Sequence, residues 1–246
     1  MLTIILAAGY GTRLYPLTLN KPKALLGVGG KTILDRLVAE VVLIKACSKI
    51  VIVTNKKFDK NFQNWAQRAS YSTDIEVIDD KTESNETRLG AIGDINLVLE
   101  KTKTTEDLLI TGSDNLFDFR LTDFVNFGKE KRPFSSIALF DVQDKKLATR
   151  YGICSLDGEK RVVDFEEKPS LPKSTLAATA LYFIPKEKIT KIYDYMKTDL
   201  TKDAPGNLMK WLAREDKLYG YPVSQAWYDI GDISSLKKAD KDFTGK

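Results

Sequence analysis

The sequence predicts an α/β fold: a doubly wound, Rossmann-like mixed sheet flanked by helices, with a smaller β-rich half toward the C-terminus. Two observations predict it. Through residues 1–120, short apolar runs rich in β-branched residues alternate with helical patterns, as in the units of a parallel sheet. Beyond them, strand-like runs follow one another across short turns such as Asp157-Gly158, which is typical of neighbouring antiparallel strands.

The individual elements follow from these patterns in chain order. Leu2–Ala8 is short, β-branched in its middle and closed by a glycine, so we expect it to be the first buried strand. The other strands expected in the first half are Lys49–Thr54, Ile75–Ile78 and Leu108–Thr111, with helices at Ile33–Ala46, Phe58–Ala69 and Ala91–Lys101. The second half is expected to contain strands at Ser135–Val142, Tyr151–Leu156, Arg161–Phe165 and Leu176–Ile184, then helices near Lys186–Lys197 and Asn207–Arg214. The tail Lys237–Lys246 is expected to be a frayed helix end on the surface.

Length and composition narrow the class of protein. The chain has 246 residues, of which 43% are hydrophobic, so we expect one domain over residues 1–246 with halves at 1–120 and 121–246. Its 38 basic residues are mixed among 34 acidic ones without a long run of one sign, which argues against a nucleic-acid partner. The apolar stretches are too short to span a membrane, and Cys47 and Cys154 lie far apart, as suits a reducing compartment. We therefore expect a cytoplasmic protein with no membrane partner.

The chain contains no histidine. That composition excludes Ser-His and Cys-His nucleophile pairs, histidine-ligated metal sites and imidazole acid–base catalysis. Any chemistry must therefore use carboxylates, lysines, arginines, backbone groups or a metal held by oxygen ligands.

The most informative segment follows the first strand and reads LAAGYGTRLYPLTLNKPKALL from Leu6 to Leu26. Gly9 and Gly11 allow the backbone to approach a ligand closely and to present N–H groups to an anion. Arg13 and Lys23 add positive charge to the same loop. The segment therefore predicts a phosphate site, with a glycine turn carrying solvated basic residues as the alternative.

Two aspartates are candidates to hold a divalent cation. Asp114 lies in the run Thr111-Gly112-Ser113-Asp114-Asn115, so we expect it at the ligand-facing end of a central strand. Asp229 lies in Trp227-Tyr228-Asp229-Ile230-Gly231, between an aromatic pair and a glycine. Together they would form a two-carboxylate magnesium site, whereas each alone could equally cap a turn.

A third charged segment, Phe165-Glu166-Glu167-Lys168-Pro169, ends an expected strand. Lys168 could bind a second anionic group, and Glu167 could accept hydrogen bonds from substrate hydroxyl groups. A charged strand end before a proline turn is the alternative.

Taken together, these segments resemble the sugar-1-phosphate nucleotidyltransferases, or nucleotide-sugar pyrophosphorylases, over nearly the whole chain. The matching segments occur in the family's order, and they are Leu6–Leu26, Gly112–Asn115, Tyr151-Gly152, Glu167-Lys168-Pro169, Leu181-Tyr182 and Trp227–Gly231. The short glucose-1-phosphate thymidylyltransferase-like enzymes resemble it most. The resemblance implies Mg²⁺-dependent transfer of a nucleotidyl group from a nucleoside triphosphate to a sugar-1-phosphate, with glucose-1-phosphate and dTTP or UTP as the expected pair. A homo-oligomer is compatible with it, since family members commonly associate.

The resemblance also implies a role for each matching position. Arg13, Lys23 and Lys168 would be the catalytic cations. The implied nucleotide-binding residues are Leu6, Ala8, Gly9, Gly11, Thr12, Asn85 and Gly90. The implied sugar-phosphate-binding residues are Gly152, Glu167, Lys168 and Tyr182, and the implied magnesium ligands are Asp114 and Asp229. The phosphate of a sugar-1-phosphate is mostly dianionic near neutral pH, since its second pKa is about 6, so it can attack without a general base.

Two positions depart from the family pattern and keep alternatives open. Asn85 stands where thymidylyl and uridylyl enzymes have a base-reading glutamine, so cytidine or uridine recognition is open. Ala180 stands where the family usually has glycine, which predicts a tighter sugar pocket. One alternative is a cytidylyltransferase acting on a sugar, polyol or choline phosphate, and another is a non-catalytic regulatory subunit that binds sugar nucleotides. An unrelated oxidoreductase is disfavoured, because Leu14 occupies the third glycine position of the dinucleotide-binding motif.

Overall fold

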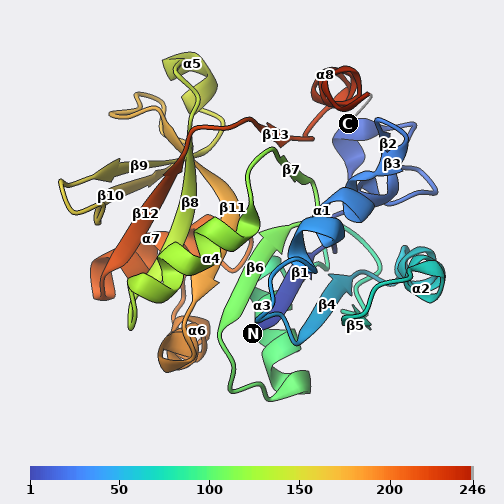
Figure 1. The fold of residues 1–246 in the computed structure, drawn as a ribbon, viewed down its shortest axis with the longest axis horizontal. Coiled ribbons are helices and arrows are strands. Elements are labelled where there is room, and N and C mark those ends of the chain that lie inside the picture. Colours follow the sequence, from blue (N-terminus) through green and yellow to red (C-terminus); the bar gives the residue numbers. More distant parts are fainter. Residues whose placement is uncertain (245–246) are drawn as a thin grey trace.

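The computed structural model describes residues 1–244, and a nine-stranded mixed sheet lies at its centre (Figure 1). Parallel strands form its N-terminal part in the order β6 (Leu108–Gly112), β1 (Leu2–Leu6), β4 (Lys49–Thr54) and β5 (Asp74–Asp79). The long strand β11 (Leu176–Ile184) pairs antiparallel with β6 and joins this part to the second half. The strands of the second half are β8 (Ser135–Asp141), β9 (Gly152–Leu156), β10 (Val162–Glu167) and β12 (Leu218–Val223). The predicted α/β class is thereby confirmed.

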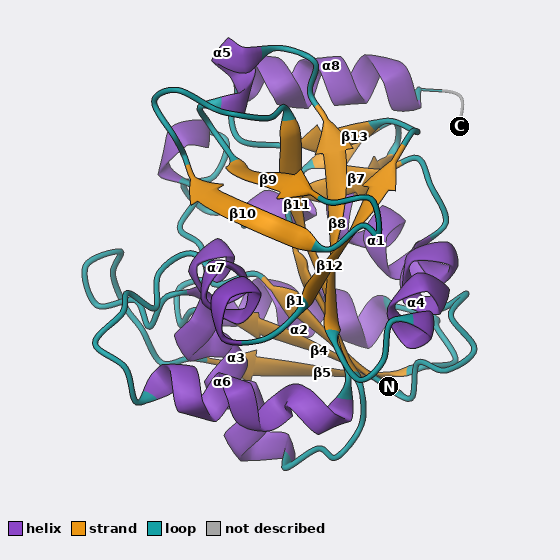
Figure 2. Ribbon diagram, turned by 90° about the vertical axis from the view of Figure 1, so that its left-hand side faces the viewer, coloured by secondary structure: helices purple, strands orange, loops and turns teal. Residues whose placement is uncertain are grey.

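Helices cover both faces of the sheet, as Figure 2 shows. One face carries α3 (Ala91–Thr102), α6 (Ile189–Met196) and α7 (Pro205–Glu215), and the other carries α1 (Ile33–Val41), α2 (Asp59–Arg68) and α4 (Leu121–Glu130). Ile4 belongs to the first core and Ile5 to the second, because successive side chains of a strand point to opposite faces. A strand buried on both faces needs apolar residues on both, which explains the nearly continuous apolar run of β1.

A two-stranded ribbon positions the candidate site. It pairs β7 (Asn115–Phe117), which directly follows the end of β6, with β13 (Trp227–Asp229) from the C-terminal part. The ribbon therefore brings Asp229 next to Asp114 from a segment more than a hundred residues later in the chain. The remaining short elements are the hairpin strands β2 (Gly27–Val28) and β3 (Lys31–Thr32), the helix α5 (Lys145–Ala148) and single 3-10 turns at Thr12–Leu14, Lys23–Leu25 and Lys186–Lys188.

Some element ends and several whole elements differ from the sequence-based expectation. The first strand ends at Leu6 rather than Ala8, and the first helix ends at Val41 rather than Ala46. The strand β12 was not expected, because its sequence LYGYPV contains Gly220 and Pro222. It forms its regular ladder only with β8, and an edge position tolerates the missing N–H of proline.

The C-terminal helix α8 (Ile233–Phe243) corrects another expectation. Over its described part, the segment Lys237–Lys246 is not a frayed surface end, because Ala239 and Phe243 are buried against the loop that follows β1. Gly29 N–H donates to Asp240 Oδ1 at 2.8 Å, which ties this helix to the β2–β3 hairpin. The apolar stripe of α8 is narrow and is flanked by lysines, so the composition of this segment does not reveal an amphipathic helix. Residues 245–246 lie outside the described part of the chain.

Between residues 1 and 244, no helix has both the length and the apolar character required to cross a membrane.

Candidate active site

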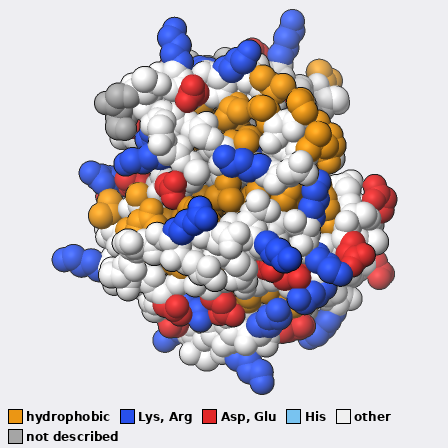
Figure 3. All heavy atoms as spheres, turned by 90° about the vertical axis from the view of Figure 1, so that its right-hand side faces the viewer, with side chains coloured by type: hydrophobic (Ala, Val, Ile, Leu, Met, Phe, Trp, Pro, Cys, Tyr) orange, Lys and Arg blue, Asp and Glu red, His pale blue; other side chains and the backbone are white. Residues whose placement is uncertain are grey.

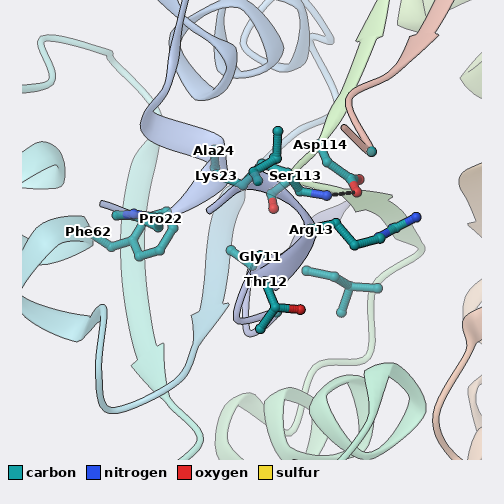
Figure 4. A pocket seen from close by; sticks show the side chains of 14 residues that line it. Gly11, Thr12, Arg13, Pro22, Lys23, Ala24, Phe62, Ser113 and Asp114 are labelled. Atoms are coloured by element: carbon teal, nitrogen blue, oxygen red, sulfur yellow. Dashed lines mark hydrogen bonds and ion pairs between the residues drawn. The ribbon is translucent and has the colours of Figure 1, made fainter. Parts of the chain in front are cut away.

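The loop after β1 surrounds a cavity of about 210 Å³ at the carboxyl edge of the parallel strands, hereafter the phosphate cavity (Figure 4). Gly11 has a φ of 64°, which glycine adopts readily, and Thr18 Oγ1 donates to its carbonyl oxygen at 2.7 Å. A Cβ at Gly9 would meet no atom within 4 Å, so the space beside that backbone is open to a ligand. The cavity is also lined by Leu6, Thr12, Arg13, Lys23 and Asp114. Glycine backbone and two cations suit this loop to an anion.

Lys23 and Asp114 form an ion pair inside this cavity, which the dashed line in Figure 4 marks. Lys23 Nζ lies 2.5 Å from Asp114 Oδ2, and Asn115 Nδ2 donates to Asp114 Oδ1 at 2.9 Å. Burial acts to raise the pKa of Asp114, but the neighbouring Lys23 ammonium outweighs burial and the pKa is lowered. Asp114 is therefore an ionised carboxylate at neutral pH.

Asp229 lies beside Asp114 because the ribbon β7–β13 pairs Asp229 with Asn115. The contact is fixed by Ile230 N–H, which donates to the Asp114 carbonyl oxygen at 3.0 Å. Burial, followed by the charge of Asp114, raises the pKa of Asp229 to about 6. Two adjacent carboxylates fit Mg²⁺, which commonly takes one or two protein carboxylates and completes its octahedron with water and substrate phosphates.

A hydrogen bond from the ribbon orients the residue next to Asp114. Trp227 Nε1 donates to Asn115 Oδ1 at 2.6 Å, which turns the Asn115 amide nitrogen toward Asp114. The Trp227 ring in turn packs edge-on against Tyr151, with ring centroids 5.1 Å apart. Both aromatic residues also line a second cavity next to the candidate metal ligands.

That second cavity, of about 160 Å³, lies beside β9, β10 and β11 and is hereafter the acceptor cavity. It is lined by Gly152, Glu167, Lys168, Tyr182, Asp114 and Asp229, among others. In the described part of the chain, no side chain or backbone group donates a hydrogen bond to the Glu167 carboxyl group, whose pKa burial raises despite Lys168. A Cβ at Gly206 would lie 2.5 Å from Glu167 Oε2, and one at Gly152 would lie 3.0 Å from it. Two glycines therefore make room for a carboxylate that is available to ligand hydroxyl groups.

Two residues other than glycine that line the acceptor cavity have a left-handed backbone. Lys168 has a φ of 47° and Ala180 a φ of 53°, a left-handed conformation that costs a residue with a side chain about 1 to 2 kcal/mol. Ala180 lies where the pairing register of β11 with β8 shifts between Ala178 and Tyr182. This conformation explains why glycine suits position 180, since only glycine adopts it without strain.

A third cavity, of about 340 Å³, opens between the end of β1 and the N-terminus of α3 and is hereafter the nucleoside cavity. Gly90 has a φ of 78°, and a Cβ there would lie 2.5 Å from the Lys202 carbonyl oxygen. Ala91 N–H donates to the Asp203 carbonyl oxygen at 2.8 Å. Arg88 Nε and Nη2 donate to Asp203 Oδ1 and Oδ2 at 2.8 and 3.0 Å. The loop before α7 thus closes one side of this cavity.

The residues assigned from the sequence all line these three adjoining cavities. The phosphate cavity includes Leu6, Gly9, Gly11, Thr12, Arg13 and Lys23, the nucleoside cavity includes Leu6, Ala8, Gly9, Asn85 and Gly90, and the acceptor cavity includes Gly152, Glu167, Lys168, Tyr182 and Asp229. Asp114 lines all three.

The lining residues that the sequence analysis did not assign include Asp94, Asp203 and Gly206. Asp94 carried a usable signal, because an acid on the apolar face of an expected helix is unusual. Asp203 and Gly206 carried none, since only the packing of α7 against β10 brings their loop to the site.

On the face that Figure 3 shows, Lys and Arg side chains are scattered, with acidic side chains between them. The basic residues do not form one continuous patch on this face, in line with the mixed charge pattern of the sequence.

Comparisons with known proteins indicate the family of the chain. Residues 2–246 match the family model for nucleotidyl transferases. The chain is 28% identical over 228 residues to a protein described as a mannose-1-phosphate guanyltransferase from Sulfolobus acidocaldarius, covering 93% of this chain and 59% of that protein. It is also 28% identical over 247 residues to the bifunctional protein GlmU of Methanococcus aeolicus, covering 96% of this chain and 53% of that protein. The chain therefore spans a little more than half the length of these relatives.

A solved structure supports the same fold. The crystal structure of a protein described as a glucose-1-phosphate thymidylyltransferase from Bacillus anthracis, in complex with a sucrose, superposes with a TM-score of 0.82 at 23% identity. The match covers 100% of this chain and 96% of that one. The family model spans both halves of the sheet and every residue of the three cavities, and on this ground the chain belongs to the nucleotidyl transferase family.

Proposed function

We propose that this chain catalyses the magnesium-dependent transfer of a nucleotidyl group from a nucleoside triphosphate to a sugar-1-phosphate, forming a nucleotide-sugar and pyrophosphate. The observation that carries the proposal is the position of Asp114, which lines the phosphate, nucleoside and acceptor cavities at once. A transferase of this kind needs its two substrates to meet at one centre in a fixed orientation. Three cavities that converge on one carboxylate support that arrangement.

The proposed reaction needs no protein nucleophile. A phosphate oxygen of the sugar-1-phosphate forms a bond to the α-phosphorus, while the bond from the α-phosphorus to the oxygen that bridges it to the β-phosphorus breaks. Pyrophosphate leaves with that electron pair. The attacking phosphate is mostly dianionic near neutral pH, so no proton has to be removed, and a chain without histidine can perform the step.

The cations of the site would supply the electrostatic stabilisation. Arg13 and Lys23 line the phosphate cavity, where negative charge builds up on the leaving pyrophosphate. Lys168 lines the acceptor cavity, where it would hold the phosphate of the incoming sugar phosphate. Glu167, without a donor in the described part of the chain, would accept hydrogen bonds from sugar hydroxyl groups.

Asp114 and Asp229 would hold the magnesium ion, which supplies charge neutralisation and alignment of the triphosphate when bound. Their adjacency across the ribbon supports this assignment, as does the lowered pKa of Asp114. Lys23 would then exchange its partner Asp114 for a phosphate oxygen.

For the acceptor we propose a hexose 1-phosphate, with glucose-1-phosphate as the first compound to test. The names of the relatives, which include a guanyltransferase and a thymidylyltransferase, differ in the base, so the donor is a separate question. A cytoplasmic location, where nucleoside triphosphates are available, is part of the same proposal, and a homo-oligomer stays compatible with it.

The test is a matrix assay of pyrophosphate release in the presence of Mg²⁺. It combines dTTP, UTP, CTP, GTP and ATP with glucose-1-phosphate, other sugar-1-phosphates, polyol phosphates and phosphocholine. Release that requires both members of one pair supports the transferase. Triphosphate binding without release from any pair would favour the regulatory subunit, and release with phosphocholine or a polyol phosphate would favour the cytidylyltransferase alternative.

A further inference from the structure

Two buried acids, Asp80 and Asp94, are neighbours, and Asp94 lines the nucleoside cavity. Asp80 directly follows β5 and is 7% exposed, and Asp94 lies in the first turn of α3 and is 5% exposed. Within residues 1–244, neither forms an ion pair with a lysine or arginine. Burying two carboxyl groups without a cation is unfavourable, so the pair requires a physical explanation.

Hydrogen bonding assigns different roles to the two acids. Asp80 Oδ1 accepts from Thr82 N–H at 2.7 Å and from Thr82 Oγ1 at 2.8 Å, and the Tyr10 hydroxyl lies 3.4 Å from Thr82 Oγ1. Asp80 Oδ2 and Asp94 Oδ1 are buried without a hydrogen-bond partner. Burial, then the charge of Asp80, raises the pKa of Asp94 to about 8, so Asp94 carries a proton at neutral pH and can share it with Asp80.

The position of Asp94 within the cavity points to the base of the nucleotide. The nucleoside cavity shares Leu6, Gly9 and Asp114 with the phosphate cavity, and Asp114, Ala180 and Pro205 with the acceptor cavity. The lining residues that belong to neither neighbour include Asn85, Arg88, Gly90 and Asp94. A nucleotide whose phosphates lie in the loop after β1 would therefore place its base at the end formed by these residues.

The two carboxyl groups of Asp80 and Asp94 can share one proton, so they have more acceptor oxygens than donors for the base of the nucleotide. A proton shared between the two acids would leave Asp94 with an acceptor oxygen for a ligand in the cavity that it lines. Cytosine, adenine and guanine each carry an exocyclic amino group that donates hydrogen bonds, whereas uracil and thymine carry oxo groups at their edge and a single N–H between two acceptors. An oxo group facing an acceptor oxygen leaves both unpaired, which a buried site penalises.

We propose, on the basis of the proposed function, that the Asp80–Asp94 pair selects a nucleoside triphosphate whose base carries an exocyclic amino group over UTP and dTTP. This differs from the dTTP or UTP expected from the family resemblance. It is in line with Asn85, which replaces the glutamine of thymidylyl and uridylyl enzymes.

The test measures equilibrium binding of CTP, ATP, GTP, UTP and dTTP with Mg²⁺ by calorimetry, without an acceptor, so that it does not depend on turnover. We expect at least one amino-bearing triphosphate to bind the unaltered protein about tenfold or more tightly than UTP and dTTP. Asp94→Leu should bring these affinities to within about threefold of one another, because the acceptor is removed. Asp94→Asn should keep the preference, since its amide can donate to Asp80 while its carbonyl still accepts. Asn96→Ala, which alters an exposed contact with Glu100 on the same helix, is the matched control.

Equal or tighter binding of UTP or dTTP by the unaltered protein would overturn the inference, and so would a preference that persists in Asp94→Leu. The first of these results does not depend on the folding of any variant. Binding with the expected preference but no pyrophosphate release from any pair would refute the proposed function and leave this inference standing. Pyrophosphate release with UTP or dTTP as the best donor would support the proposed function and refute this inference.

Discussion

The Lys23 ammonium lies 2.5 Å from Asp114 Oδ2, and this ion pair joins the loop that follows β1 to the end of β6. The two side chains are 17% and 29% exposed, so the pair is partly shielded from solvent and its attraction exceeds that of a fully exposed pair. In the proposed reaction both groups take new partners, a phosphate oxygen for Lys23 and magnesium for Asp114. The pair therefore holds the proposed catalytic cation and a proposed metal ligand together, and Asp114 lines all three cavities.

Lys23→Ala should lower turnover by about a hundredfold or more at saturating substrates, because a charge contact to the transition state is worth roughly 3 kcal/mol. The measurement is kcat for pyrophosphate release. Lys21→Ala is the matched control, since Lys21 is exposed on the same loop and does not line the phosphate cavity. Near-normal turnover of Lys23→Ala would remove Lys23 from the catalytic set.

Removal of magnesium should abolish pyrophosphate release. Excess chelator should stop the reaction, and Asp114→Asn should raise the Mg²⁺ concentration needed for half-maximal activity about tenfold or more, because one of two proposed carboxylate ligands loses its charge. Mg²⁺ titrations of activity measure this, with Asp123→Asn on the exposed side of α4 as the control. Full activity in excess chelator would refute a magnesium requirement.

Gly206→Ala should selectively weaken binding of the sugar phosphate. Its Cβ would lie 2.5 Å from Glu167 Oε2, so the carboxylate must move from the position proposed to receive sugar hydroxyl groups. We expect KM for the sugar phosphate to rise about tenfold, in line with the loss of one or two hydrogen bonds to a charged group, while binding of the triphosphate stays within about twofold.

Gly158→Ala is the control for this substitution, because a Cβ at Gly158 would meet no atom within 4 Å. An unchanged KM for the sugar phosphate in Gly206→Ala, with an intact fold by circular dichroism, would argue against Glu167 as a substrate contact.

The buried acid pair should make stability depend on pH. The pKa of Asp94 is raised to about 8 in the folded chain, well above the value of about 3.9 for an exposed aspartate. Between these values the folded state holds one more proton than the unfolded state, so the stability that this proton contributes is present below about pH 4 and is lost as pH rises through about 8. Relative to Asp94→Asn, the unaltered protein should lose up to about 1.4 kcal/mol of unfolding free energy for each pH unit in this window.

Urea unfolding of both proteins between pH 5 and pH 9 measures this difference. A gap between the two unfolding free energies that does not change with pH would show that Asp94 is not protonated in the folded chain.

Local patterns were sufficient to predict the parallel part of the sheet and the glycine turn that follows β1. The parallel strands β1, β4 and β6 are short, mostly apolar runs buried on both faces, and each helix between them has an apolar stripe, so the burial pattern can be read directly from the sequence. The glycine turn is also a local signal, because the left-handed backbone of Gly11 favours glycine.

Features that depend on distant pairing could not be predicted in the same way. The ribbon that sets Asp229 against Asn115 joins segments whose short strands have no distinctive pattern. The approach of Gly206 to Glu167 depends on where α7 packs, and the burial of Phe243 depends on the hairpin to which α8 attaches. The family resemblance implies roles for Asp229 and Glu167, but it gives no reason to single out Asp80 and Asp94.

The most direct test of the central claim is ³¹P NMR of the reaction with Mg²⁺ and the best pair from the matrix assay. We expect pyrophosphate and a nucleoside diphosphate sugar to appear in equal amounts while the sugar-phosphate signal declines by the same amount. Pyrophosphate accompanied by nucleoside monophosphate, with the sugar phosphate unchanged, would identify a hydrolase instead and contradict the proposal that the acceptor cavity delivers the attacking phosphate.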